Sequence, residues 1–261
     1  MLPYLNLFGL NIPMYGLLMA VGVILAFCVA LPRSKRLGQT IYDLIIVAAC
    51  ALGLGIFGGQ LLFTFTAFTW DQILEFARTG QWNMLINSGL VFYGGLIGGL
   101  LGGFIGCAIA KVSFWDSLYA ILPTVPLAHA IGRVGCFCVG CCYGCETTLP
   151  IAVVYTNAPG GAPLGVPLLP VQLIEAVLNL ILFTAMMLYE KKYYGKHPRL
   201  YLICIYGIGY AIIRFVLEYM RYDSIRGSAF GLSTSQWISI LILAVSLVCL
   251  LVLHLKKKKA Q

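Results

Sequence analysis

The sequence predicts an all-α, polytopic membrane protein with about seven transmembrane helices, its N-terminus outside and its C-terminus in the cytoplasm. Of its 261 residues, 61% are hydrophobic and only 10% are charged, and the mean hydropathy is +0.93. A soluble domain has about 25% charged residues, so a chain of this size cannot bury so much apolar surface without lipid. The composition excludes a soluble enzyme, a nucleic-acid-binding domain and a secreted disulfide scaffold. We expect a single integral membrane domain over residues 1–261.

Seven apolar stretches reach the roughly 20 residues that a helix needs to cross a bilayer. They lie at about 13–31, 42–68, 89–110, 117–138, 168–189, 200–221 and 232–254. An N-terminal arm of about residues 1–12 precedes them at the outer surface. We expect outer loops at about 69–88, which has room for a short interfacial helix, and at about 145–167, which is rich in Pro and Gly.

The basic residues predict the orientation. Twelve of the 17 Lys and Arg residues fall in alternate connections or at the C-terminus: Arg33, Lys35, Arg36, Lys111, Lys191, Lys192, Lys196, Arg199 and Lys256 to Lys259. The positive-inside rule assigns these segments to the cytoplasm, and seven spans then leave the N-terminus outside. This distribution explains the net charge of +8 without a nucleic-acid partner. No positive region precedes the first span, so we expect no cleavable signal peptide.

Charged side chains in the sixth span mark a candidate site, because each costs around 3 kcal/mol on membrane-insertion scales. Arg214 and Glu218 are four residues apart and share a helix face, and Arg221 continues that face. Two other interpretations remain open here. The pair could simply pin two helices together, and Arg221 could extend to the membrane interface.

A second set of polar residues lies in the fourth and fifth spans. Arg133 follows an apolar run, and Glu175 lies in the fifth span with Gln172 one turn earlier. Arg133 could pair structurally with Glu175 or with Glu218. Alternatively, Arg133 and Arg214 could face one cavity and bind a phosphate, since guanidinium groups contact phosphate in a bidentate manner. In a membrane the nearest abundant phosphate belongs to a phospholipid.

Two aromatic residues stand beside glycines at predicted helix starts. In the run at 92–103, glycines repeat every four residues, which favours close packing of another helix. Tyr93, Gly94 and Gly95 begin that run, where a helix start could face a substrate head group. Tyr15 opens the first span, and its position alone is typical of an aromatic residue at the membrane interface.

Half of the ten cysteines crowd into one short segment with the sequence CFCVGCCYGC. They are Cys136, Cys138, Cys141, Cys142 and Cys145. Two CxxC spacings occur within it, yet no complete Cys/His zinc pattern does. Packed thiols, disulfides and a metal site all remain open interpretations of this segment.

Several motifs occur together in a recognisable order. They are Tyr15-Gly16, YGGLIGG at 93–99, Gly132-Arg133-x-Gly135-x-Phe137-x-x-Gly140, Pro170-x-Gln172-Leu173-x-Glu175, Arg214-Phe215-x-x-Glu218-x-x-Arg221 and Ser235-Gln236. Over nearly its whole length the chain resembles the prolipoprotein diacylglyceryl transferases, seven-span enzymes of the bacterial cytoplasmic (inner) membrane.

The resemblance implies transfer of the diacylglyceryl group of phosphatidylglycerol to the lipobox cysteine of a prolipoprotein. The products are a thioether and glycerol phosphate. The implied partners are phosphatidylglycerol, the prolipoprotein signal peptide and membrane lipid, with no cofactor and no metal. The implied catalytic residues are Arg133, Arg214, Tyr15 and Tyr93. The implied substrate-binding residues are Glu218, Arg221, Gly94, Gly95, Gly132, Gly140, Gln172 and Glu175.

The sequence departs from the family pattern at three places. Tyr93 stands where the family usually has a His proposed to help deprotonate the thiol. The run from Cys136 to Cys141 replaces two amides and a carboxylate with Cys, Val and Cys, and Gly59-Gln60 replaces Gly-Arg. Two alternatives therefore remain: a paralogue with another thiol or hydroxyl acceptor, or a non-catalytic lipid-binding or redox membrane protein. The general base also stays unassigned.

Overall fold

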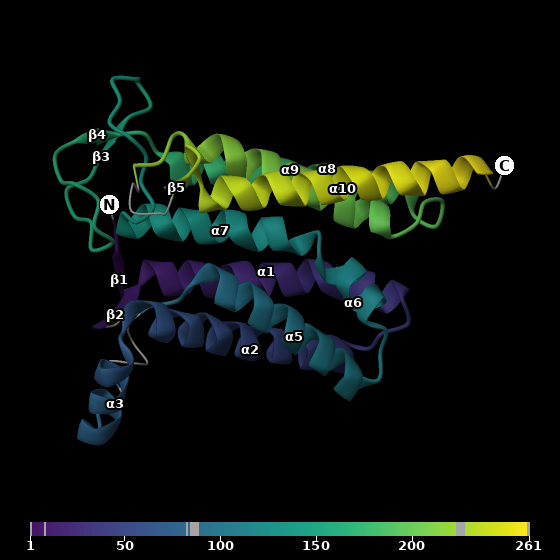
Figure 1. Ribbon diagram of the computed structural model, residues 1–261, viewed down its shortest axis with the longest axis horizontal. Helices are drawn as coiled ribbons and strands as arrows, with labels where there is room; N and C mark the ends of the chain where they lie inside the picture. Colours follow the sequence, from purple (N-terminus) through teal and green to yellow (C-terminus); the bar gives the residue numbers. More distant parts are fainter. Residues whose placement is uncertain (1, 8, 82, 84–88, 223–227, 260–261) are drawn as a thin grey trace. The chain divides into compact units, whose positions relative to one another are not determined.

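The computed structural model describes residues 2–7, 9–81, 83, 89–222 and 228–259. They form two compact units, one from residues 1–30 and 121–261 and the other from residues 31–120. Long helices dominate both units (Figure 1).

The first unit carries three short antiparallel strand pairs and five helices among its described residues. In chain order its elements are β1 (Tyr4–Leu7), β2 (Leu10–Pro13), α1 (Met14–Arg36) as far as Ala30, α7 (Thr124–Val139), β3 (Val153–Val154), β4 (Pro167–Leu168), α8 (Val171–Tyr193), α9 (Leu200–Glu218), β5 (Ser228–Ala229), β6 (Leu232–Ser233) and α10 (Thr234–Lys259). The second unit contains the end of α1 followed by α2 (Ile41–Ala67), α3 (Trp70–Thr79), α5 (Phe92–Ala110) and α6 (Phe114–Ile121).

The helices confirm the predicted fold class. Six of the described helices are long and apolar enough to cross a membrane, namely α1, α2, α5, α8, α9 and α10. The consecutive pair α6 and α7 would make a seventh span. The chain is therefore an all-α, multi-pass membrane protein, while the orientation of its termini and its single-domain organisation stay predictions.

The predicted span at 117–138 is wrong as a continuous helix. The helix α6 ends at Ile121 and α7 begins at Thr124, with Pro123 between them. Proline has no backbone N–H to continue the helical ladder. The Thr124 hydroxyl donates to the Ile121 carbonyl at 2.7 Å at the break.

Two segments that we expected outside the spans contain regular structure. The N-terminal arm is a hairpin in which Tyr4 pairs with Pro13. The helix expected within 69–88 is α3, which Thr69 and Gln72 begin with a reciprocal capping box and Gly80 ends at a φ of 71°. Both are standard signals for helix ends. Residues 82 and 84–88 lie outside the described residues.

Within the second unit, α2 and α5 pack along a stripe of glycines. A Cβ on Gly94, Gly98 or Gly102 would overlap the α2 backbone, at Gly58, Leu54 and Cys50 in turn. The later glycines of the predicted run therefore serve helix packing, as expected.

Arg33 provides a second contact in the same unit. This residue is buried, and its side chain donates to the carbonyls of Ala120 at 2.7 Å and Tyr119 at 2.8 Å. The basic residue that we counted among the cytoplasmic charges therefore ties the end of α1 to the end of α6.

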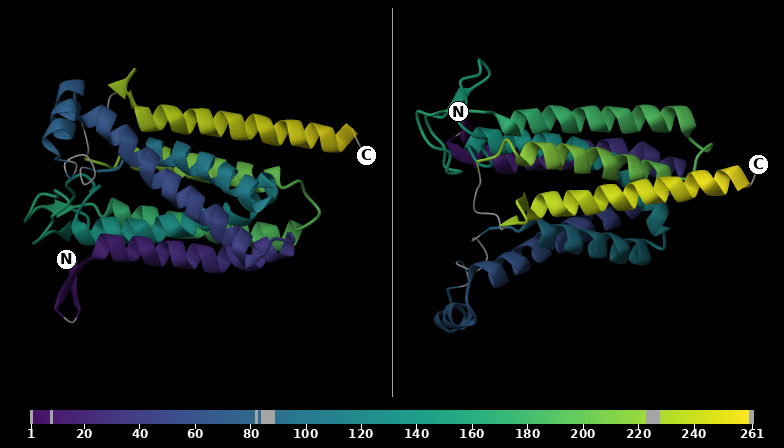
Figure 2. Two further views of the ribbon diagram at one scale, coloured as in Figure 1. Left: turned by 90° about the horizontal axis from the view of Figure 1, so that it is seen from below. Right: turned by 45° about the horizontal axis from the view of Figure 1, so that its top comes forward.

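Within the first unit, α7 lies against α8, and α9 lies between α8 and α10 (Figure 2). Close contacts of Gly132 and Gly135 also place α7 against α1. Small residues allow these approaches. Gly132 of α7 lies against Met19 of α1, and Gly209 of α9 lies against Leu182 of α8. The charged residues of α7, α8 and α9 therefore lie on helices that are neighbours in the structure.

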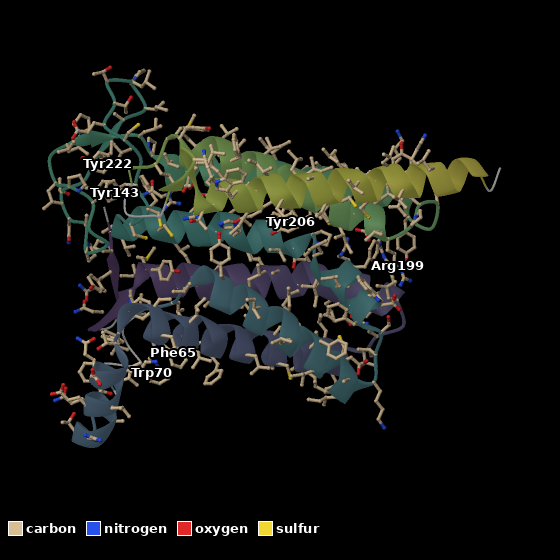
Figure 3. The ribbon with its side chains drawn as sticks, in the orientation of Figure 1. Phe65, Trp70, Tyr143, Arg199, Tyr206 and Tyr222 are labelled. Atoms are coloured by element: carbon tan, nitrogen blue, oxygen red, sulfur yellow. The ribbon has the colours of Figure 1, made fainter. Side chains whose placement is uncertain are left out.

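The Cys-rich segment, residues 136–145, begins in the last turn of α7, and its later part is held by backbone hydrogen bonds near the start of α8 and the end of α9. Gly144 donates to the Leu169 carbonyl at 3.2 Å, and Cys145 donates to the Met220 carbonyl at 2.9 Å. The rings of Tyr143 and Tyr222 stack with centroids 6.0 Å apart (Figure 3). One end of the first unit is thereby fixed around the ends of three helices.

Candidate functional site

Arg133 and Glu175 form an ion pair between α7 and α8. Nη2 of Arg133 lies 3.0 Å from Oε1 of Glu175, whose side chain is 1% exposed. Nε of Arg133 donates to Nε2 of His129 at 3.2 Å, one helical turn earlier. His129 Nε2 in turn lies 3.4 Å from the same carboxylate oxygen. The pairing with Glu175 that the sequence left open is therefore present, and it fixes the Arg133 guanidinium from two sides.

Arg214 is held by an acid on its own helix and by a hydroxyl on the next. Its Nη2 lies 2.9 Å from Oε2 of Glu218, which confirms the predicted shared face, and donates to Oγ of Ser235 at 3.1 Å. Its Nη1 is buried and makes no hydrogen bond to any described residue. A buried donor left without an acceptor costs free energy, so this N–H is available to a ligand.

The two arginine groups belong to one electrostatic network. Arg214 lies within interaction range of Glu175 as well as Glu218 and Arg221. Arg221 follows the end of α9, where its backbone forms a bridge with Gly144 of the Cys-rich segment. We call this set the charged cluster; its members are His129, Arg133, Glu175, Arg214, Glu218 and Arg221.

Tyr15 lies against α7 at the start of α1. A Cβ on Gly135 would come 3.4 Å from the Tyr15 Cα, so glycine allows the close approach. Tyr15 and Cys141 line an open cavity of about 260 Å³, together with Val139 and Gly160. The structure thus brings Tyr15 close to the Cys-rich segment.

Gly140 and Gln172 shape that segment. Gly140 ends α7 with a φ of 75°, and a Cβ there would lie 2.7 Å from the Ala158 Cβ, so only glycine fits. Gln172 is buried, and its Nε2 donates to the Cys141 carbonyl at 2.7 Å and to the Tyr155 hydroxyl at 3.3 Å. Burial raises the pKa of Tyr155 to about 12, against the opposing effect of the Gln172 hydrogen bond.

Our sequence analysis missed Asn179 and Tyr155. Asn179 is fully buried, and its Nδ2 donates to the Glu175 carbonyl at 2.8 Å. A signal for it existed, because Gln172, Glu175 and Asn179 recur at helical spacing in an otherwise apolar stretch. Tyr155 lies in a loop, where no periodicity marks a buried side chain.

Tyr93, Gly94 and Gly95 belong to the second unit, at the start of α5. A Cβ on Gly94 would overlap the Gly58 carbonyl of α2, and one on Gly95 would come 3.5 Å from the Gly55 carbonyl. The two glycines therefore contribute to the contact with α2. A role for these three residues in catalysis or substrate binding stays a prediction.

Three of the clustered cysteines converge, but not in the CxxC pairs that the sequence displays. The Sγ atoms of Cys136, Cys141 and Cys142 all lie within 4.8 Å of one another, and Cys138 and Cys145 are outside this group. All ten cysteines are free thiols. Hydrogen bonds from Cys136 and Cys141, with the positive charges of Arg221 and Arg133, lower the pKa of Cys142 against the effect of burial.

Comparison with known proteins points to one family. The family model described as prolipoprotein diacylglyceryl transferase matches residues 3–252. A phosphatidylglycerol–prolipoprotein diacylglyceryl transferase of Clostridium tetani is 34% identical over 247 residues, covering 93% of each chain. A protein of Clostridium perfringens with the same name and the number 2 is 35% identical over 261 residues, covering 97% of this chain and 96% of its own. A relative in Dehalococcoides mccartyi with that name is 30% identical over 253 residues.

Proposed function

The chain belongs to the prolipoprotein diacylglyceryl transferase family, and from this we propose that it modifies lipoprotein precursors with lipid from phosphatidylglycerol. It is a transferase that moves the diacylglyceryl group to the thiol of the precursor's lipobox cysteine. We place it in the bacterial cytoplasmic membrane, where the donor lipid and the signal peptide of the precursor meet.

The observation that carries this proposal is the buried Nη1 of Arg214, which has no hydrogen-bond partner in the described part of the chain. Glu218 and Ser235 both contact Nη2 of the same guanidinium, so they fix the orientation of the group and leave Nη1 for a ligand. Arginine in a water-poor site suits a phosphate oxygen. We assign Arg214 as the group that binds the phosphate of the donor lipid.

The reaction explains why positive charge is needed there. The acceptor thiolate attacks the glyceryl carbon, a C–S bond forms, and the C–O bond to the phosphate breaks. The phosphate thereby passes from a diester with one negative charge to a monoester that gains a second. An arginine at those oxygens stabilises the transition state more strongly than it stabilises the bound lipid. This difference lowers the barrier of the reaction.

The remaining residues divide into charge and positioning roles. We assign Arg133 and Arg221 as further positive charge at the phosphate, and Glu175 and Glu218 as the carboxylates that hold the arginines. We assign Tyr15 to the acceptor side because it lines the cavity beside Cys141.

Six further residues have proposed roles. We assign Tyr93, Gly94 and Gly95 to head-group binding. Gly132 and Gly140 allow the close helix contact and the chain reversal that position Arg133 and the Cys-rich segment, and Gln172 fixes that segment by its bond to Cys141.

A direct transfer assay tests the proposal. The full-length protein in lipid nanodiscs would receive phosphatidylglycerol labelled in its acyl chains and a lipobox peptide, with a Cys→Ser peptide as control. We expect labelled, thioether-linked lipid on the Cys peptide alone, with release of glycerol phosphate. Folded protein that consumes the lipid but leaves the Cys peptide unmodified would contradict the assignment of the lipobox cysteine as the acceptor. Protein that leaves the lipid intact would contradict the transferase itself.

A further inference from the structure

Three thiols converge beside the charged cluster, and the reaction proposed above does not use them. Cys136 lies in the last turn of α7 and is 9% exposed, while Cys141 and Cys142 follow the helix and are half-buried. Their three Sγ atoms lie within 4.8 Å of one another. Packing alone needs no such convergence, because a small apolar side chain would fill the same space.

The backbone takes an unfavourable course to bring these thiols together. Gly140 reverses the chain at the end of α7, and the N–H groups of Gly140 and Cys141 both bond to the Cys136 carbonyl. Cys142 then adopts a φ of 57°, a conformation that residues with a Cβ rarely take. Backbone strain of this kind concentrates at functional sites.

The spacing suits a soft metal ion. Zinc–sulfur bonds are about 2.3 Å long, so sulfurs in a tetrahedral zinc site lie about 3.8 Å apart. The three thiols would need to approach one another by about 1 Å at most. Thiolate ligands select thiophilic ions over magnesium or calcium.

The surrounding positive charges suit three thiolates as well. Arg133 and Arg221 both lie within electrostatic range of the Cys142 sulfur. Positive groups around ligating sulfur atoms moderate the charge of the ligands. A disulfide would use only two of the three sulfurs, and the adjacent Cys141 and Cys142 are poor partners for each other.

We propose that Cys136, Cys141 and Cys142 bind one thiophilic divalent cation, Zn²⁺ being the ion to test, and leave its fourth coordination position open. Cys141 lines the cavity shared with Tyr15, so a ligand can reach the metal from that side. Three protein ligands with an open fourth position is the arrangement of zinc sites that bind an incoming ligand. This site differs from the expectation, taken from the family resemblance, of an enzyme without metal.

The open position is suited to a thiol. This step rests on the proposed function, in which the acceptor is the cysteine of a precursor. When that thiol coordinates the metal it loses its proton to water, since a metal-bound thiol is deprotonated. The resulting thiolate is the nucleophile that the transfer requires.

Metal analysis of the full-length protein tests the site without any activity measurement. Protein purified in detergent would be fully reduced, loaded with Zn²⁺, passed through a desalting column and analysed for zinc per protomer. We expect one zinc in the wild type and in C138S or C145S, whose sulfurs lie outside the group. C136S and C142S, which each lack one of the three ligands, should retain less than a tenth of that zinc. Equal zinc in C142S and the wild type, or no zinc in the reduced wild type, would overturn the proposal.

A second measurement needs no cysteine variant, so a folding defect cannot hide the answer. Bound Zn²⁺ should protect Cys136, Cys141 and Cys142 from alkylation in the wild type, while Cys138 and Cys145 stay reactive, as mapped by mass spectrometry. Unchanged alkylation of the three would contradict the site.

The open position is tested with Co²⁺ in place of Zn²⁺. The visible absorption of the bound Co²⁺ should change on addition of the Cys peptide but not the Ser peptide. An unchanged spectrum would overturn the open position. Because neither metal measurement depends on turnover, a protein that transfers lipid but binds no metal would refute this inference alone.

Discussion

At the scale of single residues, the site consists of charged side chains in the membrane-spanning helices, and two of its contacts join different helices. The shared face of Arg214 and Glu218 could be predicted, because four residues make one helical turn. The bonds of Arg214 to Ser235 and of Arg133 to Glu175 join different helices. Sequence spacing could not choose between Glu175 and Glu218 as the partner of Arg133, because that choice depends on which helices pack together.

Glu175→Gln should destabilise the protein and reduce transfer. The substitution leaves the Arg133 charge buried without its carboxylate, and breaking a buried pair in this way costs about 3–5 kcal/mol. Thermal unfolding in detergent and the initial rate of transfer measure the two effects. Glu146→Gln is the matched control, because Glu146 is exposed on the neighbouring segment. Wild-type stability and rate in Glu175→Gln would refute a role for this carboxylate in holding Arg133.

At the scale of the elements, apolar length predicted the helices well and their interruptions poorly. Six predicted spans correspond to α1, α2, α5, α8, α9 and α10. The break at Pro123 was missed because apolar length alone does not register the loss of one backbone donor. The glycine spacing of α5 was informative because small residues at every fourth position leave a groove for another helix.

Gly98→Ala should weaken the contact between α2 and α5. The added Cβ would overlap the Leu54 carbonyl, and backbone cannot yield as a flexible side chain does. Gly53→Ala is the matched control, because a Cβ there meets nothing within 4 Å. Alanine in an open helical position is neutral or stabilises by up to about 1 kcal/mol. Comparison of thermal unfolding midpoints should show a decrease for Gly98→Ala alone; equal midpoints would contradict the packing.

At the scale of the whole molecule, composition and charge predicted the class of protein, and the family matches agree with it. The high hydropathy required a membrane, and the positions of the basic residues predict an orientation. The division into two compact units has no counterpart in the sequence, since no linker or change of composition accompanies it.

Reporter fusions test the predicted orientation. Alkaline phosphatase, which is active only outside the cytoplasm, should be active when fused after residue 80 or residue 160. It should be inactive after residue 111, after residue 196 or at the C-terminus. A cytoplasmic fluorescent protein at the same positions should give the opposite pattern and controls for expression. Active phosphatase at the C-terminus would contradict the assignment from the basic residues.

The central claim is that Arg214 stabilises the leaving phosphate, and the transfer rate of Arg214→Ala in nanodiscs tests it most directly. Removal of one donor from such a site costs about 10²–10³-fold in rate, so we predict a loss of at least about 100-fold. Arg214→Lys, which keeps the charge without the planar donor pair, should recover part of it. The exposed Arg78→Ala is the control and should match the wild type. A folded Arg214→Ala protein that transfers lipid at the wild-type rate would contradict the account.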